Sequence, residues 1–434
     1  MMDRRTFLKA SAIGAAAAPF RGAWFLPGRP SETVNVAVMG VNSRGGALAD
    51  GFARARDCRV LTICDVDSRA ADRTAESVAA PGAARPAVTD DVRRVLEDPD
   101  IDALVVAAPD HWHAPVALMA LDAGKHVYLE KPCSHNPREG EILVAAQAGS
   151  GLLIQMGNQQ RSAPESIEII QAIHEGLIGR PYFARSWYAN TRGSIGVGKP
   201  APIPDWLNFE LWQGPAPRET YRDNVVHYNW HWFTTWGTGE ICNNGTHEID
   251  ICRWALGVDY PERVTSTGGR YHFRDDWQFY DTQLASFEFS GGRQLVWDGR
   301  SCNGYPIYGR GRGSAIHGTE GTVIVDRDGY VAYNLDNQEV RRRMRGDADA
   351  ALDTRGGGDL TDLHIANFLD AIRGTDILTA PIDDARKSQL LCHLGNIAQS
   401  TGLALEIDTE TGRPAADAAR AQWAREYAPG WEIE

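Results

Sequence analysis

Short apolar runs alternate with amphipathic segments through the first third of the chain. The apolar runs have the length of strands and are rich in valine, and the segments that follow them carry apolar residues at helical spacing. The predicted strands are 33–40, 58–64, 102–108 and 126–130, and the predicted helices are 47–55, 115–123 and 137–148. This alternation predicts a parallel sheet covered by helices, with ligands at the carboxyl ends of the strands.

The pattern changes beyond residue 263. Apolar and polar residues alternate in 264–273, 282–289 and 294–299, which is typical of strands that bury one face and leave the other to solvent or to an interface. Helical spacing returns over 360–373 and 383–401. We therefore expect an open, mostly antiparallel sheet with helices in the second part of the chain.

A glycine-rich turn joins the first predicted strand to the first predicted helix. Gly40 permits a tight turn, Gly45 or Gly46 allows the helix to pack closely, and the N–H groups at the helix start can face a pyrophosphate. Asn42 stands where the usual G-x-G-x-x-G pattern has its second glycine. Since asparagine tolerates left-handed backbone angles better than most residues, we expect the turn to form with altered phosphate contacts.

An aspartate at the end of the second predicted strand strengthens this interpretation. Asp65 follows Gly40 by 25 residues, close to the spacing of an acid that binds the adenosine ribose. A carboxylate there accepts bonds from the ribose hydroxyls and repels a 2′-phosphate, which favours NAD over NADP; the alternative is an aspartate that only caps the strand end. The prediction is an α/β chain, with a Rossmann domain over 31–158 and an α+β domain for substrate binding and oligomerisation over 159–434.

The ends of the next two predicted strands carry Pro109-Asp110-His111-Trp112-His113 and Glu130-Lys131-Pro132. A dinucleotide-binding half followed by Glu-Lys-Pro resembles the glucose–fructose oxidoreductase, inositol dehydrogenase and MocA family, over residues 33–408. In that family the lysine, here Lys131, lies beside nicotinamide and substrate, and the Lys–Pro peptide bond is often cis. A metal pair is the alternative for His111 and His113, but the sequence nominates no third ligand, so we expect no metal.

The turn, Asp65 and the family resemblance together give a set of predicted contacts for NAD. These are Gly40, Asn42, Ser43, Arg44, Asp65, Asp110, Trp112, His113, Glu130, Lys131 and Asn158. The alternative for the strand-end lysine is a solvated side chain.

A helix entry in the second half supplies further catalytic candidates. Asn243, His247 and Asp250 recur at spacings of four and three, which keeps them along one side of a helix. The stretch resembles the family's D-x-G-x-H-x-x-D motif, with Asn243 in place of the first aspartate. Exported relatives similar to NAD-dependent N-acetylgalactosaminidases share this asparagine and a Trp-His-Trp, here 230–232.

The predicted reaction is oxidation of a secondary hydroxyl, at C3, of a sugar, glycoside or polyol. His247 would accept the hydroxyl proton and Lys131 would polarise the oxygen. Two alternatives stay open: a redox-neutral glycosidase or lyase that oxidises C3 transiently, and a cofactor-binding protein without catalysis. The predicted substrate contacts are Arg192, Tyr228, His231, Trp232, Asn243 and His247.

Aromatic residues are dense between residues 182 and 236. They are Tyr182, Trp187, Tyr188, Trp206, Trp212, Tyr221, Tyr228, Trp230, Trp232 and Trp236. Flat rings suit the C–H faces of pyranoses, although core or interface packing is the more common use of any one ring. The Gly- and Pro-rich segment 192–204 is predicted to be a long loop able to close over a site.

The first residues predict export. Residues 3–9 (DRRTFLK) resemble the twin-arginine export signal, and the small-residue stretch 10–18 is too short to span a bilayer. We therefore expect a leader over 1–30, a periplasmic or otherwise exported protein delivered by the twin-arginine machinery, and no membrane span. Because no NAD pool is replenished outside the cytosol, the cofactor should be held tightly.

Charge and cysteine content narrow the remaining partners. The net charge of −13 repels phosphate backbones, so nucleic acid is not expected, and the basic run 341–345 is predicted to be a solvated loop. Seven cysteines without metal-type spacing predict buried thiols rather than a disulfide framework. The family resemblance implies a homo-oligomer, either a dimer or a tetramer.

Overall fold

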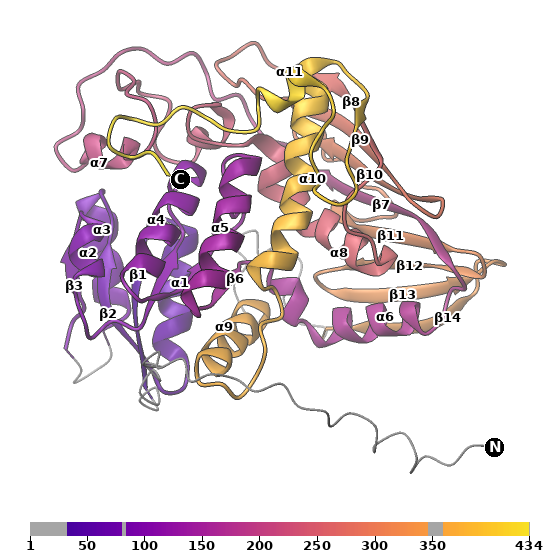
Figure 1. The fold of residues 1–434 in the computed structure, drawn as a ribbon, viewed down its shortest axis with the longest axis horizontal. Coiled ribbons are helices and arrows are strands. Elements are labelled where there is room, and N and C mark those ends of the chain that lie inside the picture. Colours follow the sequence, from indigo (N-terminus) through magenta and orange to yellow (C-terminus); the bar gives the residue numbers. More distant parts are fainter. Residues whose placement is uncertain (1–32, 80–83, 346–358, 434) are drawn as a thin grey trace, which may run out of the picture.

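The computed structural model describes residues 33–79, 84–345 and 359–433. The predicted leader over residues 1–30 lies outside these ranges. Two sheets form the framework of the described chain (Figure 1), one of six strands in the first domain and one of nine strands in the second. The predicted fold class, a parallel α/β domain followed by a mostly antiparallel α+β domain, is confirmed.

The first sheet is parallel throughout, in the order β3-β2-β1-β4-β5-β6. Its strands are β1 (Val34–Met39), β2 (Cys58–Cys64), β3 (Ala87–Thr89), β4 (Ala103–Val106), β5 (His126–Leu129) and β6 (Ile154–Met156). All residues of β4 are buried, because helices cover both faces, and this explains the unbroken apolar runs in the sequence. The strand order reverses between β1 and β4, where a ligand crevice is expected.

Helices connect these strands and begin at identifiable caps. They are α1 (Arg44–Arg54), α2 (Ser68–Ser77), α3 (Val92–Leu96), α4 (Asp110–Asp122) and α5 (Pro137–Ser150). The Asp67 side chain accepts hydrogen bonds from the first N–H groups of α2, and Asn136 does the same for α5. Helix α4 begins at Asp110 rather than at residue 115, so its first turn carries the unusual strand-end sequence into the crevice.

The second sheet is mixed, in the order β14-β13-β12-β11-β7-β10-β9-β8-β15. Its strands are β7 (Pro181–Ala189), β8 (Arg263–Gly269), β9 (Thr282–Phe289), β10 (Arg293–Arg300), β11 (Arg312–Gly318), β12 (Gly321–Asp326), β13 (Gly329–Asn334), β14 (Glu339–Met344) and β15 (Leu405–Glu406). Strands β7 and β10 are parallel neighbours, and the other pairs are antiparallel.

Helices α6 (Pro164–His174), α8 (Thr246–Leu256) and α10 (Ile382–Thr401) pack against this sheet. The shorter elements are η1 (Gln159–Ser162), α7 (Phe209–Gln213), η2 (Asn229–Trp232), η3 (Ile241–Gly245) and α11 (Asp417–Arg420). The predicted strand 264–273 is shorter in the structure, and strands β11 to β14 had no prediction.

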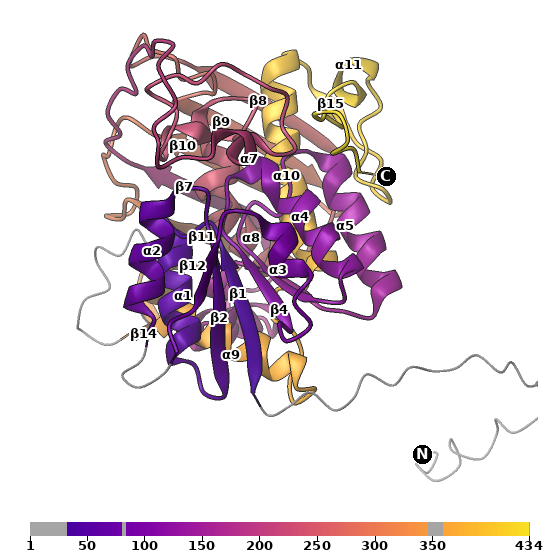
Figure 2. The same ribbon diagram turned by 90° about the vertical axis from the view of Figure 1, so that its left-hand side faces the viewer.

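Two late segments return to the first domain. Helix α9 (Asp359–Ile372) lies beside α1 (Figure 2), with Phe368 edge-on to Phe52 at a centroid distance of 6.4 Å. Near the chain end, Trp431 packs edge-on against Trp112 at 5.1 Å. The boundary predicted at residue 158 therefore separates the two sheets, but the first domain also holds parts of the C-terminal sequence.

The prediction of a solvated loop over residues 341–345 is wrong. Most of this run forms the edge strand β14, because carboxylates of α6 attract its arginines. Glu168 binds Arg341 and Arg343, and Glu165 binds Arg345 at 3.0 Å.

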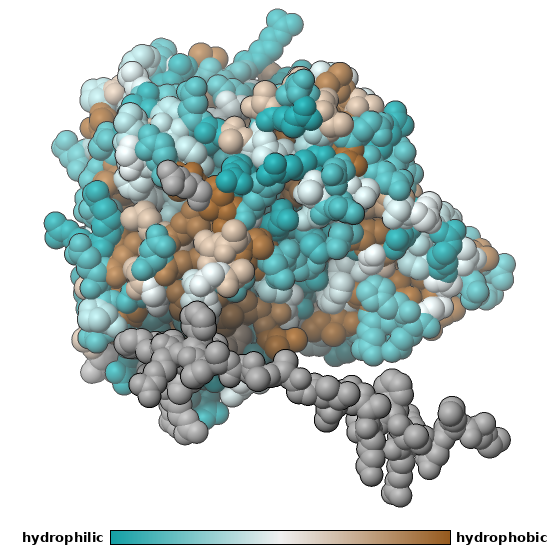
Figure 3. All heavy atoms as spheres, in the orientation of Figure 1, coloured by the Kyte–Doolittle hydropathy of each residue, from teal (hydrophilic) through white to brown (hydrophobic). Residues whose placement is uncertain are grey.

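The surface and the cysteines agree with a globular chain. Figure 3 shows a mostly hydrophilic face with an apolar area over α4 and α5. Among the described residues, no helix is long and apolar enough to cross a membrane. All seven cysteines are free thiols. Five are buried, as predicted, whereas Cys58 and Cys302 are partly exposed.

Candidate active site

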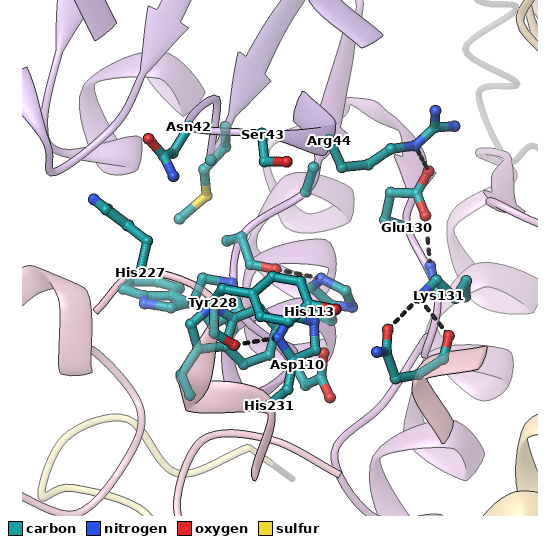
Figure 4. Close-up of a pocket in the computed structure, with 18 of the residues that line it drawn as sticks. Asn42, Ser43, Arg44, Asp110, His113, Glu130, Lys131, His227, Tyr228 and His231 are labelled. Carbon is teal, nitrogen blue, oxygen red and sulfur yellow. Dashed lines mark hydrogen bonds and ion pairs between the residues drawn. The ribbon is translucent and has the colours of Figure 1, made fainter. Parts of the chain in front are cut away.

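A cavity of about 530 Å³ lies between the two domains, at the carboxyl ends of the first sheet. This is the size of a small-molecule or cofactor site. Most predicted site residues line it: Gly40, Asn42, Ser43, Arg44, Asp65, Asp110, Trp112, His113, Glu130, Lys131, Arg192, Tyr228, His231, Asn243 and His247. Figure 4 shows Asn42, His227 and Tyr228 toward one side of this space and Glu130 and Lys131 toward the other.

The turn after β1 has the geometry that a dinucleotide requires. Gly40 has a φ of +83°, and a Cβ atom there would lie 2.5 Å from the backbone nitrogen of Ala108. A Cβ on Gly45 would lie 2.1 Å from the Gly40 carbonyl oxygen, so this glycine is needed for close packing of α1. The Ser43 side chain makes no capping hydrogen bond, which leaves its hydroxyl for a phosphate at the helix start.

Asp65 is held rigidly at the end of β2. Its carboxylate accepts hydrogen bonds from the backbone N–H groups of Val41 at 2.5 Å and Asp67 at 2.8 Å. Burial raises the pKa of this carboxyl above its usual value, while the two backbone bonds lower it. The fixed carboxylate at the edge of the cavity fits a ribose diol.

A segment of the second domain is fastened over this end of the cavity. Asp67 bridges to Leu207, the Ser68 N–H donates to the Trp206 carbonyl at 3.0 Å, and the Asn208 N–H donates to the Val66 carbonyl at 2.9 Å. His227 Nε2 lies 2.9 Å from Asp67 Oδ2. We call residues 195–228 the strap, because they close the ribose end from the opposite domain.

The ends of β4 and β5 place polar groups beside the middle of the cavity. The ring nitrogens of His113 lie 2.5 Å from the Pro132 carbonyl and 2.7 Å from that of Ala108, and those of His111 face the carbonyls of Trp212 and Trp236. No nitrogen of either ring is left for a metal, and the described residues contain no group of three metal ligands. The Lys131–Pro132 peptide bond is cis.

Asn158 does not line the cavity. Its neighbour Gln159, in η1, takes that place and donates to Glu130 Oε1 at 3.1 Å. Glu130 also pairs with Arg44 at 2.7 Å, and this pair lies beside Lys131 (Figure 4). Although burial raises the pKa of Glu130, the charges of Arg44 and Lys131 lower it overall, so the carboxylate stays ionised.

Lys131 is fixed by the helix entry of the second domain. Its ammonium donates to the Asn243 carbonyl oxygen at 2.6 Å and to Asn243 Oδ1 at 3.0 Å. Burial lowers the pKa of Lys131, and the carboxylates of Glu130 and Asp110 oppose this. Asn243, which stands in place of the motif's first aspartate, thus holds the lysine. The third ammonium hydrogen remains for a ligand oxygen.

His247 lies in the first turn of α8 with its imidazole at the cavity wall. The side chain makes no hydrogen bond to any described residue, although only 7% of the residue is exposed. Burial and the nearby charges of Arg327, Lys131, Arg312 and Arg44 lower its pKa well below 6.5. The imidazole is therefore neutral at neutral pH and free to accept a hydrogen bond.

The far wall of the cavity carries further polar groups. Arg192 binds Glu240 at 2.6 Å and the Tyr228 hydroxyl at 2.5 Å. Burial lowers the pKa of the lining residue His231 to about 3. Trp232 does not line the cavity; it stacks on Trp277 at 3.9 Å and lies under the Arg192 guanidinium at 5.0 Å.

The aromatic stretch divides between cavity and core. Tyr188, Trp212, Tyr228 and Trp230 line the cavity, and most of the other rings are buried in the two domains. Several further lining residues belonged to no predicted set of contacts. These are Asn190, His227, Asn244, Arg312 and Arg327.

Comparison with known proteins agrees with this architecture. Residues 34–158 match the family described as "Oxidoreductase family, NAD-binding Rossmann fold", and residues 212–324 match the GFO/IDH/MocA C-terminal domain. The levoglucosan dehydrogenase structure in complex with NADH and levoglucosan has a TM-score of 0.66 at 20% identity, over 86% of this chain and 99% of that one. An oxidoreductase domain protein from Kribbella flavida has a TM-score of 0.68 at 18% identity, over 87% and 99%.

Two relatives are similar in sequence. A glycosyl hydrolase family 109 protein from Saccharopolyspora erythraea is 30% identical over 44% of this chain and 45% of its own length, so the chain matches about half of that protein. An inositol 2-dehydrogenase from Rubrobacter xylanophilus is 26% identical over 68% of this chain and 72% of its own. The chain belongs to the glucose–fructose oxidoreductase, inositol dehydrogenase and MocA family.

Proposed function

We propose that this protein is an NAD-dependent oxidoreductase that acts on a secondary hydroxyl, at C3, of a sugar, glycoside or polyol. The observation that supports this most is one continuous cavity that has a dinucleotide turn and Asp65 at one end and Lys131 and His247 at the other. The inositol dehydrogenase relative and the levoglucosan complex are consistent with this substrate class.

The chemistry divides between two side chains. Bound nicotinamide supplies the acceptor for the hydride. His247, neutral and without a hydrogen-bond partner among the described residues, accepts the proton of the substrate hydroxyl. Lys131, held by Asn243, donates its remaining N–H to the same oxygen and stabilises the negative charge that develops there.

The ribose end favours tightly held NAD. A fixed carboxylate at Asp65 repels a 2′-phosphate, and the strap crosses the ribose end from the second domain. Tight binding would suit an exported protein, and the twin-arginine-like residues 3–9 support our proposal that the protein acts outside the cytosol. A homo-oligomer, dimer or tetramer, is part of the same proposal by family resemblance.

A redox-neutral glycosidase is the second candidate. It is favoured by relatives named glycosyl hydrolase family 109 protein and, in Shewanella oneidensis, alpha-N-acetylgalactosaminidase. Asn243 and the Trp230-His231-Trp232 sequence also resemble that branch.

One assay separates these reactions. The purified protein is incubated with an aryl glycoside without added NAD, while aglycone release and bound-cofactor absorbance at 340 nm are recorded together. The proposed dehydrogenase gives a keto sugar and reduced cofactor in equal amounts. Aglycone release with unchanged cofactor identifies the glycosidase, and neither product over a panel of sugars contradicts both.

A further inference from the structure

Arg327 lines the cavity and forms no ion pair with a carboxylate among the described residues. It occupies the two-residue turn between β12 and β13, which reaches from the second domain into the cavity. The turn is fastened to η1, because Gln160 Nε2 donates to the Asp326 carbonyl at 2.9 Å. The backbone that carries Arg327 is therefore held at the cavity wall.

Other arginines that line the cavity each have a carboxylate partner. Arg44 binds Glu130, Arg192 binds Glu240, and Arg312 binds Glu248 at 2.7 Å. Arg327, by contrast, makes no hydrogen bond or ion pair with any described residue and is partly buried. A partly buried guanidinium without an acceptor is costly, and native sites usually supply one.

A second unpaired donor lies close to this guanidinium. Arg312 Nη2 is buried and has no hydrogen-bond partner, since Glu248 engages Nε and Asn244 Oδ1 lies 3.3 Å from Nη1. Arg312 begins β11 and Arg327 follows β12, and these antiparallel neighbours (Ser314 opposite Val325) bring the two arginines to the same end of the sheet. Burial and Arg312 lower the pKa of Arg327 to about 9, so it remains charged at neutral pH.

This inference rests on the proposed function: we propose that the substrate is an acidic sugar, a hexuronic acid or its glycoside, whose carboxylate binds Arg327, with the positive charge of the neighbouring Arg312 reinforcing the contact. Planar guanidinium groups match carboxylates bidentately. One uncompensated cation matches a single negative charge better than the roughly double charge of a phosphate monoester. The cofactor pyrophosphate is a poorer partner, because Arg327 and Arg312 belong to the second domain, whereas the dinucleotide turn at Gly40 belongs to the first.

The same carboxylate would assist the proposed base. Arg327, Lys131, Arg312 and Arg44 all disfavour a charged imidazole at His247. A bound carboxylate offsets part of this positive charge, so that an acidic substrate makes proton transfer to His247 easier than a neutral sugar does.

Binding and turnover test this inference with matched pairs of ligands. The purified full chain with its cofactor is titrated calorimetrically with methyl β-D-glucuronide and methyl β-D-glucoside, and with the corresponding galacturonide and galactoside. The acidic member of one pair should bind about 10- to 100-fold more tightly, as expected for a charge-assisted hydrogen-bonded contact. Oxidation of the same ligands is followed at 340 nm.

Variants locate the effect. In Arg327→Met the acidic and the neutral glycoside should bind with about equal affinity. Arg327→Lys keeps the positive charge but loses the planar pair of N–H donors, and it should retain part of the preference. Arg342→Met is the matched control, because Arg342 is exposed on β14 and pairs with Glu339; its preference should equal that of the wild type. Melting curves of all variants identify any that fail to fold.

Several results would overturn the inference. They are equal binding of acidic and neutral glycosides by the wild type, tighter binding of glucose 6-phosphate than of the glucuronide, or loss of NAD from Arg327→Met with the acid preference unchanged. Oxidation of neutral glycosides without acid preference leaves the oxidoreductase proposal intact. Absence of oxidation of every sugar contradicts that proposal, whereas the binding titration still decides the acid preference.

Discussion

The two ends of the cavity differ in how completely their polar groups are paired within the chain. At the ribose end, Asp65 accepts two backbone N–H groups and Asp67 binds both Arg69 and His227. At the opposite end, His247 and Arg327 have no hydrogen-bond partner among the described residues. Unpaired buried groups cost free energy, so the first end is complete in itself and the second is completed by its ligand.

In this account the paired end binds the cofactor, and the unpaired end binds the substrate on which the reaction takes place. The paired end presents few adaptable groups and fits a resident cofactor that stays bound from one turnover to the next. The unpaired end presents donors and one neutral acceptor that a substrate can engage. Substitutions at the two ends should therefore affect different measurements, cofactor retention in one case and turnover in the other.

The largest effect is expected at the proposed base. His247→Ala should lower kcat, here the maximal rate at which added sugar reduces the bound cofactor, by about 1000-fold, because the hydroxyl proton loses its acceptor, while cofactor content stays unchanged. Single-turnover absorbance measurements at 340 nm with nucleotide analysis of the same sample provide the check. Activity within tenfold of the wild type would remove His247 from this role.

Lys131→Ala should lower kcat by about 100-fold, since charge on the substrate oxygen loses its donor. Lys387→Ala, which changes a partly exposed lysine paired with Asp259, is the control and should keep the wild-type kcat within experimental error. Unchanged kcat in Lys131→Ala, with cofactor bound, would contradict the proposed geometry.

At the paired end the effect should be smaller and of another kind. Although burial raises the pKa of Asp67, hydrogen bonds from Arg69 and His227 lower it below its usual value, so the carboxylate binds His227 in ionised form. Asp67→Asn keeps a good helix cap but weakens the contact with His227. It should speed cofactor release about tenfold and leave kcat nearly unchanged. Asp72→Asn, on the same helix and paired with Arg85, serves as the comparison. Equal release rates in both variants would show that the strap does not retain the cofactor.

The smallest effect concerns pH. Above its pKa His247 is neutral and accepts a proton; below it the ring is charged and activity falls. Since burial and four cations hold this pKa well below 6.5, kcat/KM should change by less than about twofold between pH 7.5 and 6.5 and fall only in more acidic buffer. An acidic limb centred at or above 6.5 would mean that His247 is not the group observed.

Much of the first domain could be predicted from sequence, because its buried strands are long apolar runs and its glycine turn has fixed steric demands. Strands β3 and β6 were missed, since three residues are too few for a recognisable pattern. Asn158 was predicted to line the cavity, but its neighbour Gln159 does so, because a single turn of η1 decides which of the two residues faces the cavity.

Only some of the residues at the unpaired end could be predicted from the sequence. Lys131 and His247 stand in motifs, but Arg312 begins an ordinary strand and Arg327 lies in a hairpin turn, where an arginine normally faces solvent. Only the packing of the β12–β13 turn on η1 brings Arg327 into the cavity, and that contact joins residues 166 apart in the sequence. His227 was missed for the same reason, since its partner Asp67 lies 160 residues away.

The central claim is that a sugar hydroxyl is oxidised by a dinucleotide that stays in this cavity. The most direct measurement is nucleotide analysis of the purified protein by mass spectrometry, before and after one addition of sugar without external cofactor. We predict about one NAD per chain beforehand and its stoichiometric conversion to NADH afterwards. A protein that holds no dinucleotide, even after incubation with excess NAD, would contradict the account.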